Sequence, residues 1–256
     1  MKLKFLSLFA LALVLCFSCS EDSNSDSFMD DNPNAISQLI TSISVVSAQD
    51  PSENTTITIN YDSANRVQSV TDGVETGIFA YQNGDLANVQ SGPDVFSVDE
   101  LYQAPYDAFE TGEVLTYNTD GNPVLLSFFD TEFDWDTNMD VTVEYRAEIE
   151  YETQLNPYFY TIQAARGIDV MDNVQFNFSA NPNAPQLVQA SALFPSKNIK
   201  KITYLDLDGN VLAELTMDYV YNANDYPTSA TATSTEYDEF DGDTTSIFAL
   251  TYTYLQ

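Results

Sequence analysis

The sequence predicts an all-β fold, an antiparallel meander of consecutive hairpins. From about Gln38 onward, apolar and polar residues alternate with a period of two, which is the spacing of a half-buried strand rather than of a helix. Between these runs lie Asn, Asp and Gly, the residues that tolerate the positive φ values of tight hairpin turns. The composition agrees, because Tyr and Phe number 16 each against a single Trp, and aromatic side chains favour pleated, half-buried surfaces.

Three segments show the alternation most clearly. Their apolar positions are Ile57, Ile59 and Tyr61; Leu215, Met217, Tyr219 and Tyr221; and Phe248, Leu250, Tyr252 and Tyr254. The segment 39–46 also fits a helical spacing, but its β-branched residues favour a strand. Turns are expected at 62–65, 83–84, 120–122, 208–210 and 222–224, each after an apolar or aromatic strand end.

The least strand-like part of the body begins at Asn156 and runs to Phe194. Residues 158–168 predict one short helix that ends at Gly167, and prolines interrupt the segment that follows. We therefore expect a crossover, or a cap over one end of the sheet.

The N-terminus predicts export and lipidation. Residues 1–18 have the form of a lipoprotein signal peptide, with Lys2 and Lys4 before an apolar stretch and Ser18 before Cys19. An ordinary signal peptide is the alternative. After cleavage, Cys19 would carry acyl chains, whose buried CH₂ groups each contribute about 0.8 kcal/mol to membrane affinity. Residues 19–35 are rich in Ser, Asp and Asn and predict an acidic, flexible tether, which leaves residues 36–256 as a single all-β domain.

Charge and residue types exclude several classes of function. The chain has 8 Lys and Arg against 39 Asp and Glu, a net charge of −31, and such a field repels nucleic acids. It has no His, which excludes Ser-His-Asp and Cys-His catalysis and zinc sites that use His. Both cysteines lie in the leader, so the body has neither a disulfide framework nor a thiolate metal site.

Short motifs resemble a known repeat. Tyr precedes the predicted turns at Asp62, Asn118 and Asn222, and the segments 61–67 and 221–228 resemble two copies of the YD (Rhs-type) repeat. The layout is similar to a family of Bacteroidota surface lipoproteins that has no established activity, whose Tyr-Asp-x-Lys-x-Asn-Pro-Phe element corresponds to residues 151–158. This resemblance implies a curved, barrel-like meander, and the acidic stretch after Cys19 implies the cell surface.

A calcium site is one hypothesis for the acidic alternation in residues 133–151. Its residues are Asp134, Asp136, Asn138 and Asp140. Preserved parity across a hairpin predicts a three-residue loop that places Asp136 opposite Asp140, where a cation would relieve the repulsion. Met139 and Tyr145 stand where an EF-hand needs Gly and Glu, so the loop is not an EF-hand. The alternative is a solvated acidic face without a cofactor. Calcium titration of the mature domain separates the two, because an unchanged melting temperature at millimolar calcium excludes the site.

Aromatic residues suggest a second hypothesis, carbohydrate binding by stacking on exposed rings. The candidates are Trp135, Tyr158 and Tyr160. The alternative is that these rings belong to the core, as the strand alternation suggests for most aromatics.

Catalysis is not expected. A glycosidase needs two carboxylates about 5–10 Å apart, but nothing in the sequence singles out a pair. No Gly-rich phosphate loop and no Gly-x-Ser-x-Gly elbow occurs. The sequence thus predicts a non-catalytic lipoprotein of the outer membrane or cell surface that binds a partner or polymer. A glycan-binding accessory module of a polysaccharide-uptake system is the first alternative, and a carboxylate-dependent glycoside hydrolase is the second.

Overall fold

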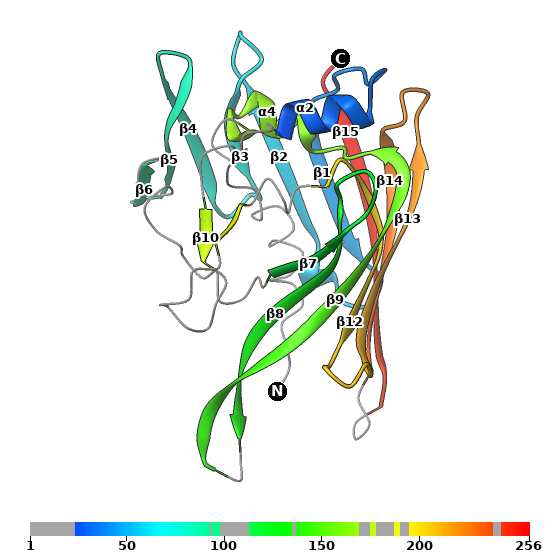
Figure 1. The fold of residues 1–256 in the computed structure, drawn as a ribbon. Coiled ribbons are helices and arrows are strands. Elements are labelled where there is room, and N and C mark those ends of the chain that lie inside the picture. The colour runs from blue at the N-terminus through cyan, green and yellow to red at the C-terminus, as the bar shows by residue number, and fades with distance from the viewer. Residues whose placement is uncertain are drawn as a thin grey trace.

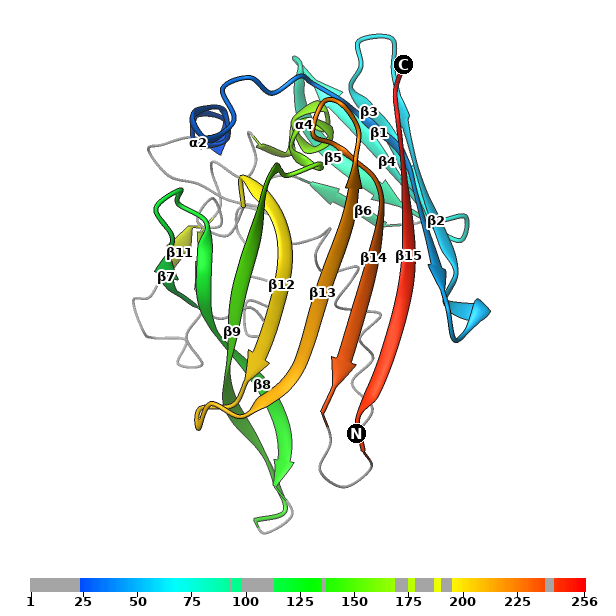
Figure 2. The same ribbon diagram turned by 90° about the vertical axis from the view of Figure 1, so that its right-hand side faces the viewer.

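One antiparallel sheet of 13 strands forms the body of the molecule. The computed structural model describes residues 24–92, 94–97, 113–134, 137–168, 175–177, 187–189, 195–237 and 242–256. Across the sheet the strand order is β6-β5-β4-β3-β2-β1-β15-β14-β13-β12-β9-β8-β7, and β10 pairs with β11 in a separate two-stranded sheet (Figures 1 and 2). The predicted all-β meander of hairpins is confirmed.

The elements have the following bounds. The strands of the first half are β1 (Ile40–Ser47), β2 (Thr55–Tyr61), β3 (Val67–Thr71), β4 (Thr76–Gln82), β5 (Asp85–Ser91), β6 (Asp94–Ser97), β7 (Glu113–Tyr117) and β8 (Pro123–Asp134). Those of the second half are β9 (Met139–Leu155), β10 (Gln175–Asn177), β11 (Leu187–Gln189), β12 (Lys197–Leu205), β13 (Val211–Tyr221), β14 (Pro227–Glu236) and β15 (Thr244–Tyr254). The helical elements are α2 (Asn24–Asp31), the 3₁₀ turn η1 (Pro51–Glu53) and α4 (Phe159–Ala164).

Two pairings join strands that are distant in the chain. β1 pairs with β15, which brings together the two ends of the domain, and β9 pairs with β12 across the segment that contains α4. The other pairings in the large sheet join strands that follow one another in the chain, as expected of a meander. The sheet curls, and β6 and β7 are its two ends in the strand order rather than partners of one another (Figure 2). It is therefore an open, curled sheet.

One face of the sheet, here called the inner face, carries the hydrophobic core. Alternation directs a single set of side chains to this side, and cross-strand neighbours stack there, as in the row Val45, Leu250 and Ala230. The buried core residues of this cluster are Ile40, Ile43, Val45, Ile59, Val67, Met217, Ala230, Ala232, Leu250 and Tyr252. Most of the core thus comes from the central strands, including β1, β2, β13, β14 and β15.

The opposite, outer face carries mainly hydroxyl side chains on its central strands. One cross-strand row that runs from β4 to β15 consists of Thr76, Thr71, Thr58, Ser42 and Thr253. Thr combines high strand propensity with a polar surface, so this face is suited to contact with water. The two faces account for the period-two pattern of the sequence.

One end of the sheet is covered by α2 and α4 (Figure 1), and we call it the helix-capped end. Phe28 of α2 stacks on Phe159 of α4 with ring centroids 3.7 Å apart, and Tyr160 meets Phe28 edge-on. Thr161 fixes α4 to β1, because its hydroxyl accepts a hydrogen bond of 2.9 Å from the backbone N–H of Ile40. The short helix expected within residues 158–168 is confirmed as α4.

From residue 24 onward, the segment 19–35 that the sequence predicts as a flexible tether is ordered. Asn24–Asp31 forms α2, in which Phe28 is 1% exposed. The stretch is acidic and polar, so its local pattern indicates solvation. Its order comes from the contact of Phe28 with aromatic rings more than a hundred residues away in the chain.

The predicted register of the β8–β9 hairpin was also wrong. Asp134 pairs with Met139 and Phe133 pairs with Asp140, so four residues rather than three lie between the strands. Asp140 consequently faces Phe133 instead of Asp136. A loop of even length reverses the parity between the two strands, and loop length cannot be read from alternation alone.

In the part of the chain that the structure describes, no helix is long and apolar enough to cross a bilayer.

Candidate functional site

Four hairpin turns repeat one arrangement. In each, an Asp or Asn accepts hydrogen bonds through its side chain from backbone N–H groups within the turn, and its own N–H donates to the carbonyl four residues later. The first residues of these turns are Asp62, Asn118, Asp206 and Asn222. The fourth position of each has a positive φ and is Asn65, Gly121, Gly209 or Asp225. These are residue types that tolerate this conformation, which explains why turn chemistry was visible in the sequence.

A tyrosine from a neighbouring strand locks three of these turns. Tyr81 donates its hydroxyl to the carbonyl of Val67 at 2.6 Å, directly after the turn at Asp62. Tyr151 and Tyr254 make the equivalent bonds to Pro123 and Pro227, at 2.6 and 2.7 Å. The three locked turns lie at the helix-capped end, whereas the turn at Asp206 lies at the opposite end (Figure 2). The three tyrosine hydrogen bonds therefore stabilise the turns at one end of the sheet.

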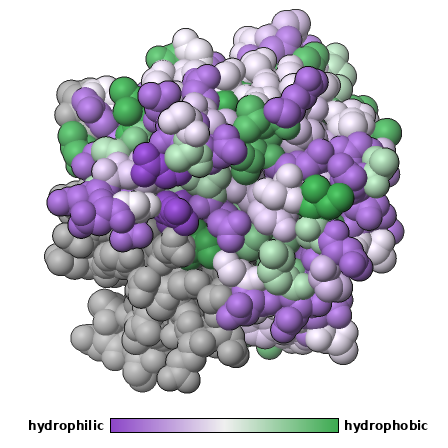
Figure 3. All heavy atoms as spheres, turned by 90° about the horizontal axis from the view of Figure 1, so that it is seen from above, coloured by the Kyte–Doolittle hydropathy of each residue, from purple (hydrophilic) through white to green (hydrophobic). Residues whose placement is uncertain are grey.

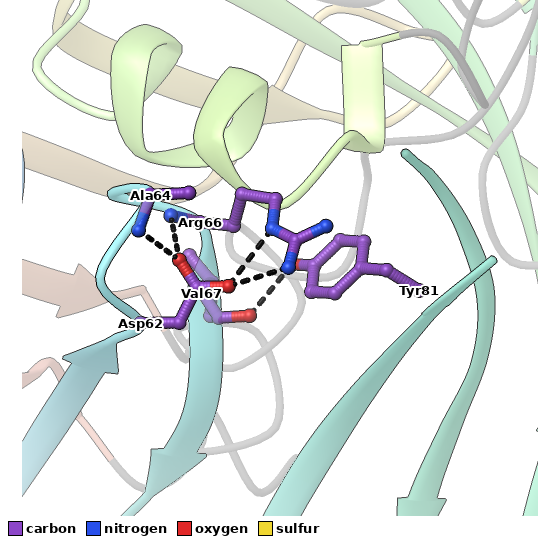
Figure 4. Close-up of polar contacts among 5 residues, drawn as sticks. All are labelled: Asp62, Ala64, Arg66, Val67 and Tyr81. Carbon is purple, nitrogen blue, oxygen red and sulfur yellow. Dashed lines mark hydrogen bonds and ion pairs between the residues drawn. The ribbon is translucent and has the colours of Figure 1, made fainter. Parts of the chain in front are cut away.

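The turn at Asp62 carries an additional ion pair (Figure 4). The Arg66 guanidinium lies 2.7 Å from the Asp62 carboxylate and 4.5 Å from the centroid of the Tyr81 ring, so one side chain joins the turn to β4. Hydrogen bonds from the backbone and side chain of Arg66 lower the pKa of Asp62. The pair is partly exposed and its contribution to stability is correspondingly small.

The inner face forms a continuous apolar and aromatic surface towards β8 and β9. One cross-strand row consists of Leu126, Ala147, Tyr204 and Ala213, and the next contains Ile149, Ile202 and Leu215. Phe128 contacts Tyr145 and Tyr204, with ring centroids 5.7 and 5.9 Å apart. Tyr204, Leu215 and Phe128 are only partly buried, so this half of the inner face offers apolar contact area.

Tyrosines of the inner face and the helix-capped end have raised pKa values because they are buried. Burial raises the pKa of Tyr61, Tyr204 and Tyr221 to about 12. Burial also raises the pKa of Tyr252, whose hydroxyl lies 3.4 Å from that of Tyr158. These phenols are neutral at physiological pH, and they serve as packing groups and hydrogen-bond donors.

Among the described carboxyl groups with a shifted pKa, Glu236 differs from the rest. Burial raises its pKa, whereas hydrogen bonds lower the pKa of Asp50, Asp72 and Asp206. Glu236 ends β14, and its cross-strand neighbours are Ala213 and Thr244. A glycosidase acid needs a second carboxylate within about 5–10 Å, and neither cross-strand neighbour is one.

Two residues proposed for carbohydrate stacking belong to the packed interior. Tyr160 is 6% exposed and joins the cluster of Phe28, Phe159 and Tyr226. Tyr158 packs against the main core and meets Tyr252 edge-on. Tyr160 therefore offers no free face for a sugar, and Tyr158 is partly buried. The third candidate, Trp135, lies outside the described residues.

The proposed calcium residues are brought together only in part. Thr137 donates to the Asp134 carboxylate at 2.7 Å, Asn138 has a positive φ of 55°, and Asp140 is exposed opposite Phe133. Asp136 lies outside the described residues. Within those residues, no group of three or more acidic, His or Cys side chains has the geometry of a metal site. Calcium binding stays a prediction. It was based on a pairing of Asp136 with Asp140, and the observed register pairs Asp140 with Phe133 instead.

Sequence reasoning missed the contacts that fix α2 to the sheet. Lys197 donates through Nζ to the Asp31 carbonyl at 2.9 Å and to Asn32 Oδ1 at 2.7 Å. Ser196 donates from its hydroxyl to the Asp31 carboxylate and from its backbone N–H to Asn122 Oδ1. The one signal in the sequence was the apolar pair Phe28 and Met29 within an otherwise polar, acidic stretch.

The anchor predicted at Cys19 lies outside the described residues, as does the rest of the leader. Lipidation of Cys19 therefore stays a prediction from the sequence.

Comparisons with known proteins find similarity in solved structures alone. No family model and no curated protein matches the chain. A porin-like protein from Bacteroides uniformis is 11% identical, with 84% of this chain and 98% of that chain covered and a TM-score of 0.37. A porin-like protein from Bacteroides vulgatus is 9% identical, with 86% and 99% covered and a TM-score of 0.39. A LolA superfamily protein from Nitrosomonas europaea is 10% identical, with 91% and 94% covered and a TM-score of 0.25.

Proposed function

We propose that the protein is a non-catalytic binding protein of the cell envelope, anchored by lipid on Cys19, that holds an apolar ligand against the inner face of its open sheet. The observation that carries this proposal is the inner face itself. From β13 to β8 it presents partly buried apolar and aromatic side chains, among them Leu215, Tyr204 and Phe128. Apolar area left partly exposed on a concave sheet is favourable for binding at about 25 cal/mol per Å² removed from water.

The chemistry of the described acids supports a non-catalytic role. The raised pKa of Glu236 comes from burial beside Ala213 and Thr244, without a neighbouring acid in the same cross-strand row. The lowered pKa values of Asp62, Asp72 and Asp206 belong to turns, where the carboxylates accept backbone hydrogen bonds. These groups are occupied in holding the fold together.

Glycan binding receives less support from the described residues. It required exposed rings, and Tyr158 and Tyr160 pack into the interior instead. A glycan array with the mature domain tests this alternative directly, and specific binding to a glycan would replace the apolar ligand in the proposal.

Binding is tested with a fluorescent fatty acid, dansyl-undecanoic acid, titrated into the mature domain. We expect saturable binding that weakens about tenfold in Leu215→Gln, a loss of about 1.4 kcal/mol, because a polar group replaces apolar contact area. Thr216→Gln is the matched control, since Thr216 is the next residue on β13 and belongs to the outer face, opposite Thr233. Absence of saturable binding by folded protein, or equal affinities of the two variants, would refute the apolar site.

The anchor is tested separately by fractionation of cells that express the full chain. We expect the unaltered protein in the membrane fraction and Cys19→Ala in the soluble fraction. A Cys19→Ala protein that stays with the membranes would exclude the lipid anchor.

A further inference from the structure

The distance between the proposed lipid and the folded domain is much shorter than the sequence alone suggests. A flexible tether through residues 19–35 would reach about 55 Å at ~3.4 Å per residue. Since α2 begins at Asn24, however, five residue steps separate Cys19 from the first residue of this helix. Five steps span at most about 17 Å when fully extended. The domain therefore cannot move far from its anchor as long as α2 remains docked.

Apolar contacts hold α2 firmly on the sheet. Phe28 is 1% exposed and lies in one cluster with Phe159, Tyr160, Ile168 and Tyr226. The Phe28 ring stacks on Phe159 with an interplanar angle of 1°. Removal of a buried Phe side chain typically costs about 3–5 kcal/mol, which is more than an isolated eight-residue helix contributes by itself.

A buried polar network completes the docking. Asn32 is 8% exposed and donates through Nδ2 to the carbonyl of Ser196 at 3.3 Å. Lys197 binds the C-terminal end of α2 through the Asp31 carbonyl, where a cation also complements the helix dipole. Asn122, the last residue of a turn at the helix-capped end, accepts from Ser196. The helix is thus fixed to both β12 and the β7–β8 turn.

The segment that connects α2 to β1 also lies at the helix-capped end. The hydroxyl of Tyr226 donates to the Ile36 carbonyl at 2.7 Å, and Asn222 donates to the side chain of Gln38 at 3.0 Å. Met29, Ile36 and Leu255 are 45%, 56% and 42% exposed there. Figure 3 shows this end with hydrophobic patches set among hydrophilic residues. Such a mixed surface is suited to contact with lipid headgroups.

We propose that the helix-capped end faces the lipid surface at close range, with the turn at Asp206 pointing away from it. This orientation rests on the proposed anchor at Cys19. Docked α2 acts as a fixed spacer, so the long axis of the strands stands up from the membrane. β13 runs between the two ends and its 11 residues span about 35 Å, which separates a near end from a far end by a measurable distance.

Energy transfer from two positions on the lipidated protein tests the orientation. Cys16 would be removed with the signal peptide and the sulfur of Cys19 would carry the lipid, so Ala223→Cys or Leu207→Cys adds one labelling site to the acylated mature protein. Ala223 and Leu207 lie in exposed turns at opposite ends of β13. In phosphatidylcholine vesicles that contain a rhodamine lipid acceptor, we expect severalfold more transfer from a donor at 223 than from a donor at 207.

Two further variants test whether docked α2 causes this difference. Phe28→Ala removes the stacking contact, and Ser27→Ala is the control at the exposed neighbouring position. Insertion of ten Gly and Ser residues before Asn24 lengthens the tether without a change in the core. We expect the difference between the two donor positions to disappear with Phe28→Ala and with the insertion, and to persist with Ser27→Ala.

The outcomes distinguish the orientation from the anchor. Protein that sediments with the vesicles but transfers equally from 223 and 207 would overturn the orientation and leave the anchor intact. Protein that does not sediment with the vesicles would overturn the anchor, and the orientation with it. A difference that survives the insertion would show that α2 is not the spacer.

Discussion

Single tyrosines hold successive hairpins together by a repeated contact. Tyr81, Tyr151 and Tyr254 each donate a hydroxyl to a backbone carbonyl immediately after a turn, on the strand next to their own. Because the register shifts beside each turn, a carbonyl at that position lies outside the regular pattern of hydrogen bonds between the strands. The phenol supplies the donor that the ladder no longer provides. The abundance of tyrosine in the sequence thus has a structural cause beyond strand propensity.

The substitution Tyr81→Phe measures this contact. It keeps the ring over Arg66 and removes the donor for the Val67 carbonyl, so we expect a loss of about 1–2 kcal/mol in the free energy of unfolding. Urea denaturation followed by circular dichroism provides the value. Tyr117→Phe, at a ring that is 42% exposed, serves as the control and should change the stability by less. Equal losses in the two variants would contradict the role of the lock.

At the scale of elements, the hairpin turn is the unit that the sequence encodes most directly. Asp62, Asn118, Asp206 and Asn222 close their turns by the same local hydrogen bonds, and all the residues involved lie within five positions. Helix α2 is the opposite case, because its formation depends on Phe159 and Lys197. The register of the β8–β9 hairpin was likewise not predicted from alternation, because the observed loop of four residues reverses the parity between the two strands. Local interactions could be predicted, whereas distant ones could not.

Substitution of Asn222 tests the turn. In Asn222→Ala the backbone N–H groups of Asn224 and Tyr226 lose their acceptor, and we expect a loss of about 1–2 kcal/mol. Asn222→Asp keeps the acceptor oxygen, as Asp62 and Asp206 do in the equivalent turns, and should retain most of the stability. The midpoint of urea unfolding at constant slope measures both changes. A loss in Asn222→Asp as large as in Asn222→Ala would show that the side-chain cap is unimportant.

At the scale of the whole molecule, a highly acidic chain is built around neutral phenols. The chain carries a net charge of −31, while buried tyrosines belong to the two hydrophobic clusters. Burial raises the pKa of Tyr61, Tyr81, Tyr204 and Tyr221 to about 12, above the value near 10 of an unfolded chain. The free energy of unfolding therefore depends on pH through the ionisation of several tyrosine hydroxyls.

Alkaline titration tests this linkage. Between pH 10 and 12 the unfolded chain loses phenolic protons that the folded chain retains, so the stability present below pH 10 falls as the pH rises. We expect cooperative unfolding in this range, with tyrosinate absorbance at 295 nm and loss of the far-ultraviolet strand signal changing together. Tyr204→Phe removes one raised group and should shift the midpoint to higher pH. Ionisation of the tyrosines near pH 10 without loss of structure would contradict the burial of these phenols.

The sequence by itself determined the features that depend on neighbours in the chain. Alternation of side chains specified strands, and Asn, Asp and Gly specified the turns between them, because both depend on a few consecutive residues. Tertiary structure alone decided the pairing of β1 with β15, the docking of α2 by Phe28, and the packing of Tyr158 and Tyr160 against the two hydrophobic clusters. These features depend on contacts between residues up to about two hundred positions apart in the chain. A local sequence pattern does not indicate which distant residues a side chain will contact.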